Sequence, residues 1–107
     1  MQINLKATKI ELTPEIKVYV QKKMDSLDKY LGSFKLIKAE VEVAMTTNHH
    51  VKGEIYRAEI NLSLPGELLR VEKTETDIFK AIDKVRDHME MIIKKYKEKI
   101  IDKSRQG

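Results

Sequence analysis

The sequence has no cysteine and no tryptophan among its 107 residues, and only 6% of them are aromatic. The lack of cysteine excludes disulfide bonds and cysteine-ligated metals, and it fits a reducing cytoplasm, where we expect the protein to act. No apolar run approaches the roughly 18 residues that a membrane span needs, and the N-terminus lacks the apolar segment of a signal peptide. We expect one domain over residues 1–107, with 102–107 as a basic tail or the start of a linker.

The sequence also offers little material for catalysis. Its four glycines are spread along the chain, so it has no glycine-rich phosphate loop. His49 and His50 are neighbours, without the three- or four-residue spacing of a metal pair, and no acidic ligand accompanies them, which favours a solvated loop. Asp83 and Asp87 share a helix face, but lysines lie within one turn of them, so salt pairing explains them more simply than acid/base chemistry. We therefore predict no enzyme activity, no cofactor and no metal.

The positive charge of the chain is unevenly placed. Residues 1–13 and 32–75 together carry eight basic and eight acidic residues. The whole net charge of +4 therefore comes from residues 14–31 and 76–107. A one-sided basic surface favours a polyanionic partner, nucleic acid or an anionic membrane, although a merely solubilising helix face is the alternative.

Periodic apolar residues predict six elements. Alternation with period two predicts strands at 1–7, 36–45, 56–64 and 67–73, and three-and-four spacing predicts helices at 14–31 and 76–105. Thr13 and Pro14 suit a helix start, and Pro65-Gly66 predicts a type II turn between the last two strands. The spacing in Thr74-Glu75-Thr76-Asp77 predicts a capping box that opens the second helix.

This order predicts an α+β fold, a two-layer β-α-β-β-β-α sandwich with two helices on one face of a four-stranded sheet. The other face of the sheet should meet water and carries both charge signs, so polyanion contact should come from the helix side. The residues expected on that outer face are Lys6, Lys38, Glu40, Glu42, Arg57, Glu59, Arg70 and Glu72.

The second helix has one apolar and one basic face. Its predicted buried residues are Ile78, Ile82, Val85, Met89, Ile92 and Tyr96. A basic row, Lys84, His88, Lys95 and Lys99, lies about 100° away and is interrupted by Met91. On the first helix Lys22, Ser26 and Lys29 lie beside the apolar stripe, with Lys23 near its edge.

If the helices pack side by side, these two rows could form one continuous basic surface. Such a surface fits the phosphate-rich groove of folded RNA. The few aromatic residues argue against a reader of single strands, and a membrane role is weaker because the sheet needs the apolar face of the helix.

Several motifs together resemble one known family. They are Leu12-Thr13-Pro14-Glu15-Ile16, Leu27-Asp28-Lys29-Tyr30, Glu59-Ile60-Asn61-Leu62-Ser63-Leu64-Pro65-Gly66 and Asp77-Ile78-Phe79-Lys80-Ala81-Ile82-Asp83. In this order they resemble the ribosome hibernation promoting factor and ribosome-associated inhibitor A family over nearly the whole chain. The resemblance implies a fold similar to double-stranded RNA-binding domains, and it implies binding in the mRNA and tRNA channel of the small ribosomal subunit, with inhibition of translation in starved or stationary cells.

The resemblance also implies site residues. Basic positions of the family are matched by Lys17, Lys23 and Lys29 in the first helix and by Lys95 and Lys97 in the second. Ser26 and His88 stand where members usually carry lysine, and Met91-Ile92-Ile93 stands where they often read Arg-Gln-Leu. The predicted RNA-binding residues, including lysines that could compensate, are Lys22, Lys23, Lys29, Lys84, His88, Lys94, Lys95, Lys97 and Lys99.

The expected partner is the small ribosomal subunit through its rRNA, with no small-molecule substrate and no membrane, and we expect the isolated domain to be monomeric. The alternative is a general structured-RNA-binding module without ribosome preference. The end of the sequence resembles the end of the first domain in the family's long form, and a natural short form is equally compatible.

Overall fold

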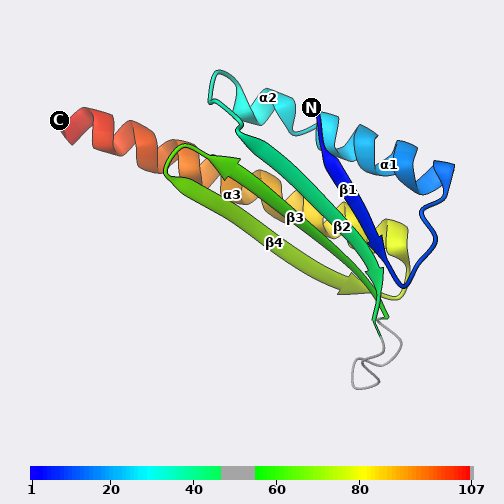
Figure 1. The fold of residues 1–107 in the computed structure, drawn as a ribbon. Helices are drawn as coiled ribbons and strands as arrows, with labels where there is room; N and C mark the ends of the chain where they lie inside the picture. The colour runs from blue at the N-terminus through cyan, green and yellow to red at the C-terminus, as the bar shows by residue number, and fades with distance from the viewer. Residues whose placement is uncertain (47–54, 107) are drawn as a thin grey trace.

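The structure, a computed structural model, describes residues 1–46 and 55–106, with side chains as far as residue 103, so the predicted loop histidines His49 and His50 lie outside the described residues. The chain forms two layers, a twisted sheet and three helices on one of its faces (Figure 1). The elements in order are β1 (Asn4–Thr8), α1 (Pro14–Asp25), α2 (Asp28–Leu31), β2 (Lys38–Met45), β3 (Tyr56–Leu64), β4 (Glu67–Glu75) and α3 (Ile78–Gln106).

The sheet has the strand order β1-β2-β3-β4. The strands β2, β3 and β4 form the predicted antiparallel meander, and β1 pairs in parallel with β2. A parallel pair needs a crossover connection, which α1 and α2 provide. Leu64 pairs with Glu67 across the hairpin, where Gly66 has the positive φ, +77°, that the predicted turn requires. The α+β sandwich is confirmed.

The core lies between the inner face of the sheet and the helices. Fully buried residues of both layers include Val20, Met24, Leu27, Val43, Ile60, Leu62, Val85, Met89 and Ile93. The predicted placement of Ile92 on the buried face needs correction, because Ile92 is half-buried while Ile93 is fully buried. The buried sector of α3 is shifted towards Ile93 because α1 packs against α3 on that side.

The first helix is shorter than predicted. Residues 14–31 form two helices, interrupted at Ser26 and Leu27, instead of one. The Ser26 hydroxyl donates to the carbonyl of Lys23, and the Leu27 amide donates to the carbonyl of Met24. Such bonds to residues three positions back tighten the last helical turn, which ends α1 before α2 begins at Asp28.

The start of the long helix also differs from the prediction. The expected capping box is wrong: Thr74 and Glu75 belong to β4, where they pair with Arg57 and Tyr56 of β3. The cap is Asp77, whose carboxylate accepts hydrogen bonds from the amides of Phe79 (2.7 Å) and Lys80 (3.3 Å). The helix then runs to Gln106, within the region 102–107 that was expected to form a tail, and it extends beyond the β3–β4 turn (Figure 1).

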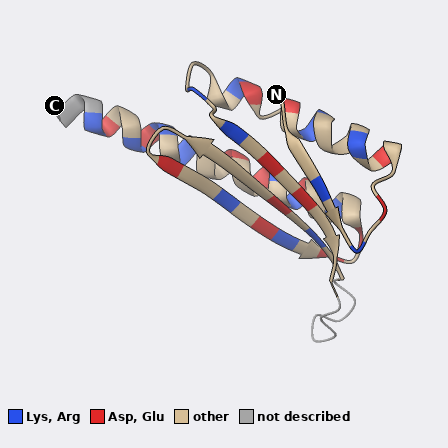
Figure 2. Ribbon diagram, viewed as in Figure 1, with Lys and Arg blue, Asp and Glu red and all other residues tan. Residues whose placement is uncertain are grey.

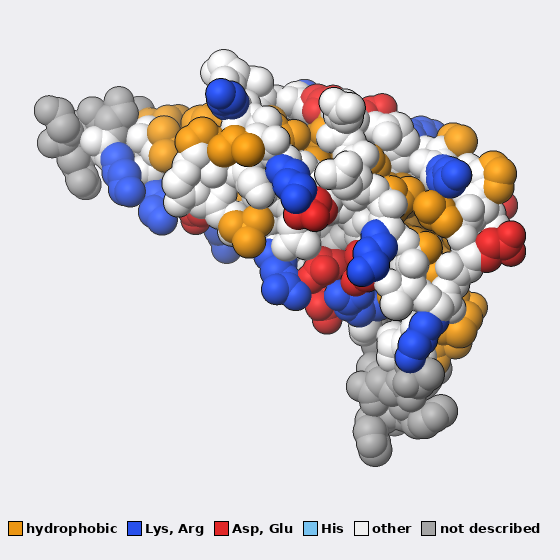
Figure 3. Space-filling view, viewed as in Figure 1, with side chains coloured by type: hydrophobic (Ala, Val, Ile, Leu, Met, Phe, Trp, Pro, Cys, Tyr) orange, Lys and Arg blue, Asp and Glu red, His pale blue; other side chains and the backbone are white. Residues whose placement is uncertain are grey.

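The outer face of the sheet is a network of ion pairs. Arg57 lies 2.7 Å from a carboxylate oxygen of Glu42 and 3.3 Å from those of Glu59 and Glu72, and Arg70 lies 2.7 Å from Glu59. Positive and negative residues are both present along these strands (Figure 2), and their side chains lie next to one another on the surface (Figure 3). The mixed charge predicted for this face is confirmed, and it leaves little net charge there.

Candidate nucleic-acid interface

The helices α1 and α2 lie along one side of α3. Tyr19 packs edge-on against Phe79, with ring centroids 5.0 Å apart, and Phe34 packs in the same way against Tyr96 at 5.4 Å. We call this side of α3, together with the outward surface of α1 and α2, the α1 flank. The opposite side of α3 faces the last strand of the sheet, and we call it the β4 flank.

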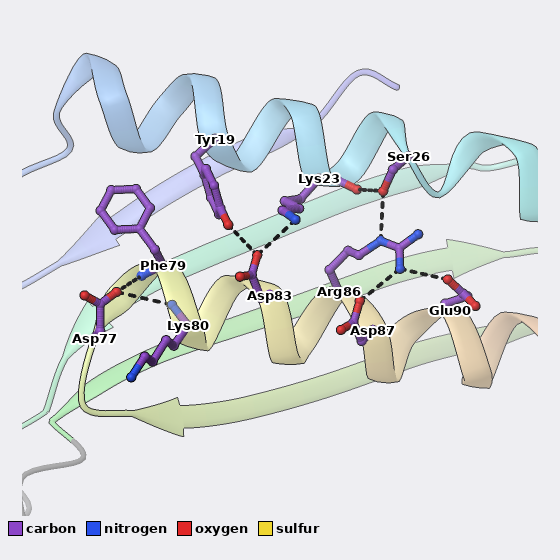
Figure 4. A network of polar contacts seen from close by, with 10 residues as sticks. All are labelled: Tyr19, Lys23, Ser26, Asp77, Phe79, Lys80, Asp83, Arg86, Asp87 and Glu90. Atoms are coloured by element: carbon purple, nitrogen blue, oxygen red, sulfur yellow. Dashed lines mark hydrogen bonds and ion pairs between the residues drawn. The ribbon is translucent and has the colours of Figure 1, made fainter.

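Asp83 joins α1 to α3 near the start of the α1 flank (Figure 4). The Tyr19 hydroxyl donates to its carboxylate at 2.6 Å, and the Lys23 ammonium lies 3.1 Å from the same oxygen. The hydrogen bond to Asp83 is the main cause that raises the pKa of both Tyr19 and Lys23. Lys23 therefore stays charged, and its charge is partly compensated by Asp83.

Arg86 is the second link between the helices (Figure 4). Its guanidinium donates to the hydroxyl of Ser26 (2.8 Å), which lies between α1 and α2. It also donates to the carboxylates of Asp87 (3.0 Å) and Glu90 (2.7 Å) on α3. The Arg86 side chain is only 14% exposed. The planar guanidinium presents several donors in a fixed geometry, which suits a link of this kind.

Several lysines of the α1 flank lie close to aromatic rings. The Lys29 and Lys94 ammonium nitrogens each lie 5.1 Å from the centroid of the Tyr30 ring, and the Lys97 ammonium lies 6.0 Å from that of Phe34. These distances are typical of cation–π contacts, which hold long side chains in place without neutralising them.

The structure divides the nine predicted RNA-binding residues between the two flanks. The α1 flank holds Lys22, Lys23, Lys29, Lys94 and Lys97, and the β4 flank holds Lys84, His88, Lys95 and Lys99. Lys84 pairs with Glu75, and Lys99 lies 3.8 Å from Glu67, both residues of β4.

The hypothesis of one continuous surface made by the first helix and the row at Lys84 to Lys99 is therefore wrong. The first helix packs beside the other flank of α3, where Asp83 and Arg86 make its contacts. Helical periodicity gives the angle of a residue from the buried face, and it leaves open which neighbour each flank meets.

The lysines differ in their partners. Lys23, Lys84, Lys94 and Lys99 each lie within 4 Å of a carboxylate. Among the residues that the structure describes, Lys22, Lys29, Lys95 and Lys97 have no such partner. Since an exposed ammonium without a carboxylate neighbour loses no ion pair when it meets a phosphate, these four are the most available cations of the predicted set.

The β4 flank contains a shallow groove between β4 and α3. His88 and Met91 line it together with charged residues of both elements. The Nδ1 atom of His88 is buried without a hydrogen-bond partner in the described part of the chain, and Met91 is 56% exposed. The groove carries acidic as well as basic side chains. The β4 flank is less suited to a phosphate backbone than the α1 flank because, among the described residues, it holds one predicted lysine without a carboxylate partner, whereas the α1 flank holds three.

Arg86 and Tyr30 are not among the site residues predicted from the sequence. The pattern Arg86, Glu90 and Lys94, with a spacing of four, was the available signal, because residues four apart on a helix lie next to one another. For Tyr30 the sequence carried no such signal, because its neighbours Arg86 and Lys94 come from a distant part of the chain.

Over residues 1–46 and 55–106, no helix is long and apolar enough to cross a membrane. The same part of the chain holds no group of three or more histidine, aspartate or glutamate side chains placed to bind a metal ion.

Comparison with known sequences finds relatives that are named ribosome hibernation promotion factor. The chain is 29% identical to a ribosome hibernation promotion factor of Deinococcus radiodurans, over 100% of the chain and 55% of the relative. It is 31% identical to the protein of the same name from Lactococcus lactis subsp. cremoris, over 98% of the chain and 54% of the relative. The chain thus spans about half the length of these curated relatives.

Solved structures share the fold. The N-terminal domain of Thermus thermophilus Protein Y matches with a TM-score of 0.74 and 34% identity, covering 90% of this chain and 99% of that domain. A ribosomal subunit interface protein from Coxiella burnetii matches with a TM-score of 0.73 at 16% identity, covering 92% of this chain and 99% of that one, which bears on the fold alone. The model of the family described as sigma 54 modulation protein / S30EA ribosomal protein matches residues 3–101, so the chain belongs to that family.

Proposed function

We propose that this protein binds the small ribosomal subunit in the channel that holds mRNA and tRNAs, and that it inhibits translation there in starved or stationary cells. It acts by occupying space and catalyses no reaction. The observation that carries the proposal is the uneven charge of the two layers: the outer sheet face is internally neutralised, whereas the helices hold the net positive charge. The names of its family relatives support the ribosome as the partner.

The α1 flank is the surface that we propose for rRNA contact. It combines lysines that have no carboxylate partner in the described part of the chain, such as Lys29 and Lys97, with aromatic rings of packed helices beneath them. Contacts of this kind bind phosphates and read the shape of folded RNA with little base recognition. The β4 flank, with Lys95 and Lys99, would make a secondary contribution.

A general structured-RNA-binding module is the second candidate. The observation that favours it is the chemistry of the α1 flank, where ammonium and guanidinium groups would recognise phosphates of any folded RNA. A competition experiment separates the two candidates. The protein is bound to ribosomal subunits, and either generic duplex RNA or free subunits are added as competitor. Equal displacement by the two competitors would favour the general module.

Co-sedimentation with purified small ribosomal subunits tests the proposal directly. We expect the protein to sediment with the subunits at low salt and to be released at high salt, because phosphate contacts weaken as counterions accumulate. An added leaderless mRNA with initiator tRNA should compete for the same channel. Absence of binding at low salt would contradict the proposed function.

A further inference from the structure

Tyr30 is surrounded by three cations that come from separate parts of the chain. Lys29 lies next to it in α2, and Arg86 and Lys94 belong to α3. The Arg86 guanidinium carbon lies 5.8 Å from the centroid of the Tyr30 ring, and the two ammonium nitrogens lie 5.1 Å from it. We call these four residues the Tyr30 cradle. The ring attracts the cations and, unlike a carboxylate, leaves their charge uncompensated.

One carboxylate, that of Glu90, lies between two cations of the cradle. Its Oε1 atom is 2.7 Å from the Arg86 guanidinium and its Oε2 atom is 2.9 Å from the Lys94 ammonium. Two oxygens of a phosphate would meet an arginine and a lysine in the same way. Lys94 above all, and Arg86 and Tyr30 in addition, lower the pKa of Glu90 to about 2, so this carboxylate is ionised at neutral pH.

Each cation of the cradle has a contact that does not involve Glu90, since Lys29 and Lys94 lie over the Tyr30 ring and Arg86 bonds to Ser26. Arg86 is also held by Ser26 of the neighbouring helix and by Asp87. Lys29 has no carboxylate within 4 Å among the described residues. Among the described residues, Glu90 pairs with Arg86 and Lys94, each four residues away on the same helix, and it also interacts with Tyr30. Pairs at this spacing are weak where the side chains are exposed, and the Lys94 side chain is 54% exposed. Its side chain can therefore turn away while the cradle stays in place.

We propose that the Tyr30 cradle is a phosphate-binding site on the RNA surface and that Glu90 is its internal occupant, which an RNA phosphate displaces on binding. The inference rests on the proposed function, because it takes the phosphate from the RNA of the ribosome. Glu90 then occupies the cradle in the unbound protein and weakens its hold on RNA.

The substitution Glu90→Gln tests this role, because it removes the charge and keeps the size of the side chain. Glu98→Gln is the matched control, since Glu98 lies exposed on the same helix and the substitution changes the net charge equally. We expect Glu90→Gln to tighten binding to small ribosomal subunits about three- to tenfold more than Glu98→Gln, with a salt dependence steeper by about one phosphate contact. Equal effects of the two substitutions, or weaker binding by Glu90→Gln, would overturn the proposal.

A titration with inorganic phosphate, followed by NMR on the Tyr30 ring and the Arg86 side-chain NH, tests the cradle without a ribosome. We expect saturable shifts that are larger in Glu90→Gln than in the wild type and in Glu98→Gln. Equal responses in all three proteins, or none, would overturn the proposal. If the wild type fails to bind ribosomal subunits, the proposed function fails, and the phosphate titration alone decides whether the cradle exists.

Discussion

At the scale of single residues, the lysines of the predicted site differ by what surrounds them. Lys29 and Lys97 lie over aromatic rings and have no carboxylate partner among the described residues, whereas Lys23 shares its charge with Asp83. A phosphate that approaches Lys23 must compete with a carboxylate that is already in place. The neighbours of a lysine in the fold therefore say more about its role than its position in the sequence does.

This difference predicts the outcome of paired charge reversals. The double substitution Lys29→Glu with Lys97→Glu should weaken binding to small ribosomal subunits about tenfold more than Lys95→Glu with Lys99→Glu. Both pairs change the net charge equally, and three of the four side chains are exposed while Lys97 is half-buried, so the fold should survive, which circular dichroism can check. Affinity measured by sedimentation decides the question, and a larger loss from the second pair would move the interface to the β4 flank.

The side of α3 on which a residue lies could be predicted from the sequence more readily than the element that this side contacts. Spacing along the helix correctly placed Lys84 and Lys99 on the same side of α3, where each lies near a carboxylate of β4. The flank on which α1 would pack could not be read from this spacing, because it depends on side chains such as Arg86 that reach across to another helix. Contacts between distant segments leave no periodic trace in the sequence.

At the scale of elements, the strands were the most predictable part. The alternation of apolar and polar residues in β3 and β4 predicted which residues face the core, and the Pro65-Gly66 pair predicted the hairpin. Both are local properties, a two-residue periodicity and a positive φ at glycine, so they can be read from the sequence. Helix ends were less predictable. Thr74 was expected to begin the capping box, but its backbone pairs in the sheet with Arg57, which a local pattern could not reveal.

The observed start of α3 leads to a prediction about its cap. Asp77→Ala should lower the free energy of unfolding by about 0.5–2 kcal/mol, because two amides at the helix start lose the carboxylate that accepts their hydrogen bonds. Thr76→Ala is the control, since Thr76 is exposed and precedes the cap. Urea denaturation at neutral pH measures both variants. An equal loss in the two would mean that Asp77 does not stabilise the helix start.

At the scale of the whole molecule, several carboxylates are held in the ionised form by cations. The pKa of Glu42 is lowered mainly by the hydrogen bond from Arg57, and that of Glu75 mainly by Lys84. The pKa of Glu90 is lowered from 4.5 to about 2, mainly by the hydrogen bond from Lys94. The described ion pairs therefore span both the outer face of the sheet and the helix layer.

These shifts predict the pH dependence of stability. A carboxylate with a lower pKa in the folded state binds fewer protons there than in the unfolded chain, so folding is favoured above the unfolded pKa. We expect the free energy of unfolding to be nearly constant from pH 7 to about 5.5 and to fall as the pH drops from about 4.5 towards 2. Urea denaturation across this range measures it, and Glu90→Gln should show a shallower fall. A stability that rises on acidification would contradict the ion pairs.

The neutral sheet face described above has a consequence for how the molecule moves before it touches a partner. With the net charge of +4 confined to the helical segments, the protein carries a permanent electric dipole that runs from one layer to the other. In the field of a polyanion, a dipole experiences a torque, so the molecule turns its helices forward while it is still diffusing. Added salt shortens the range of that field, and association should slow as the orientation at first encounter becomes random.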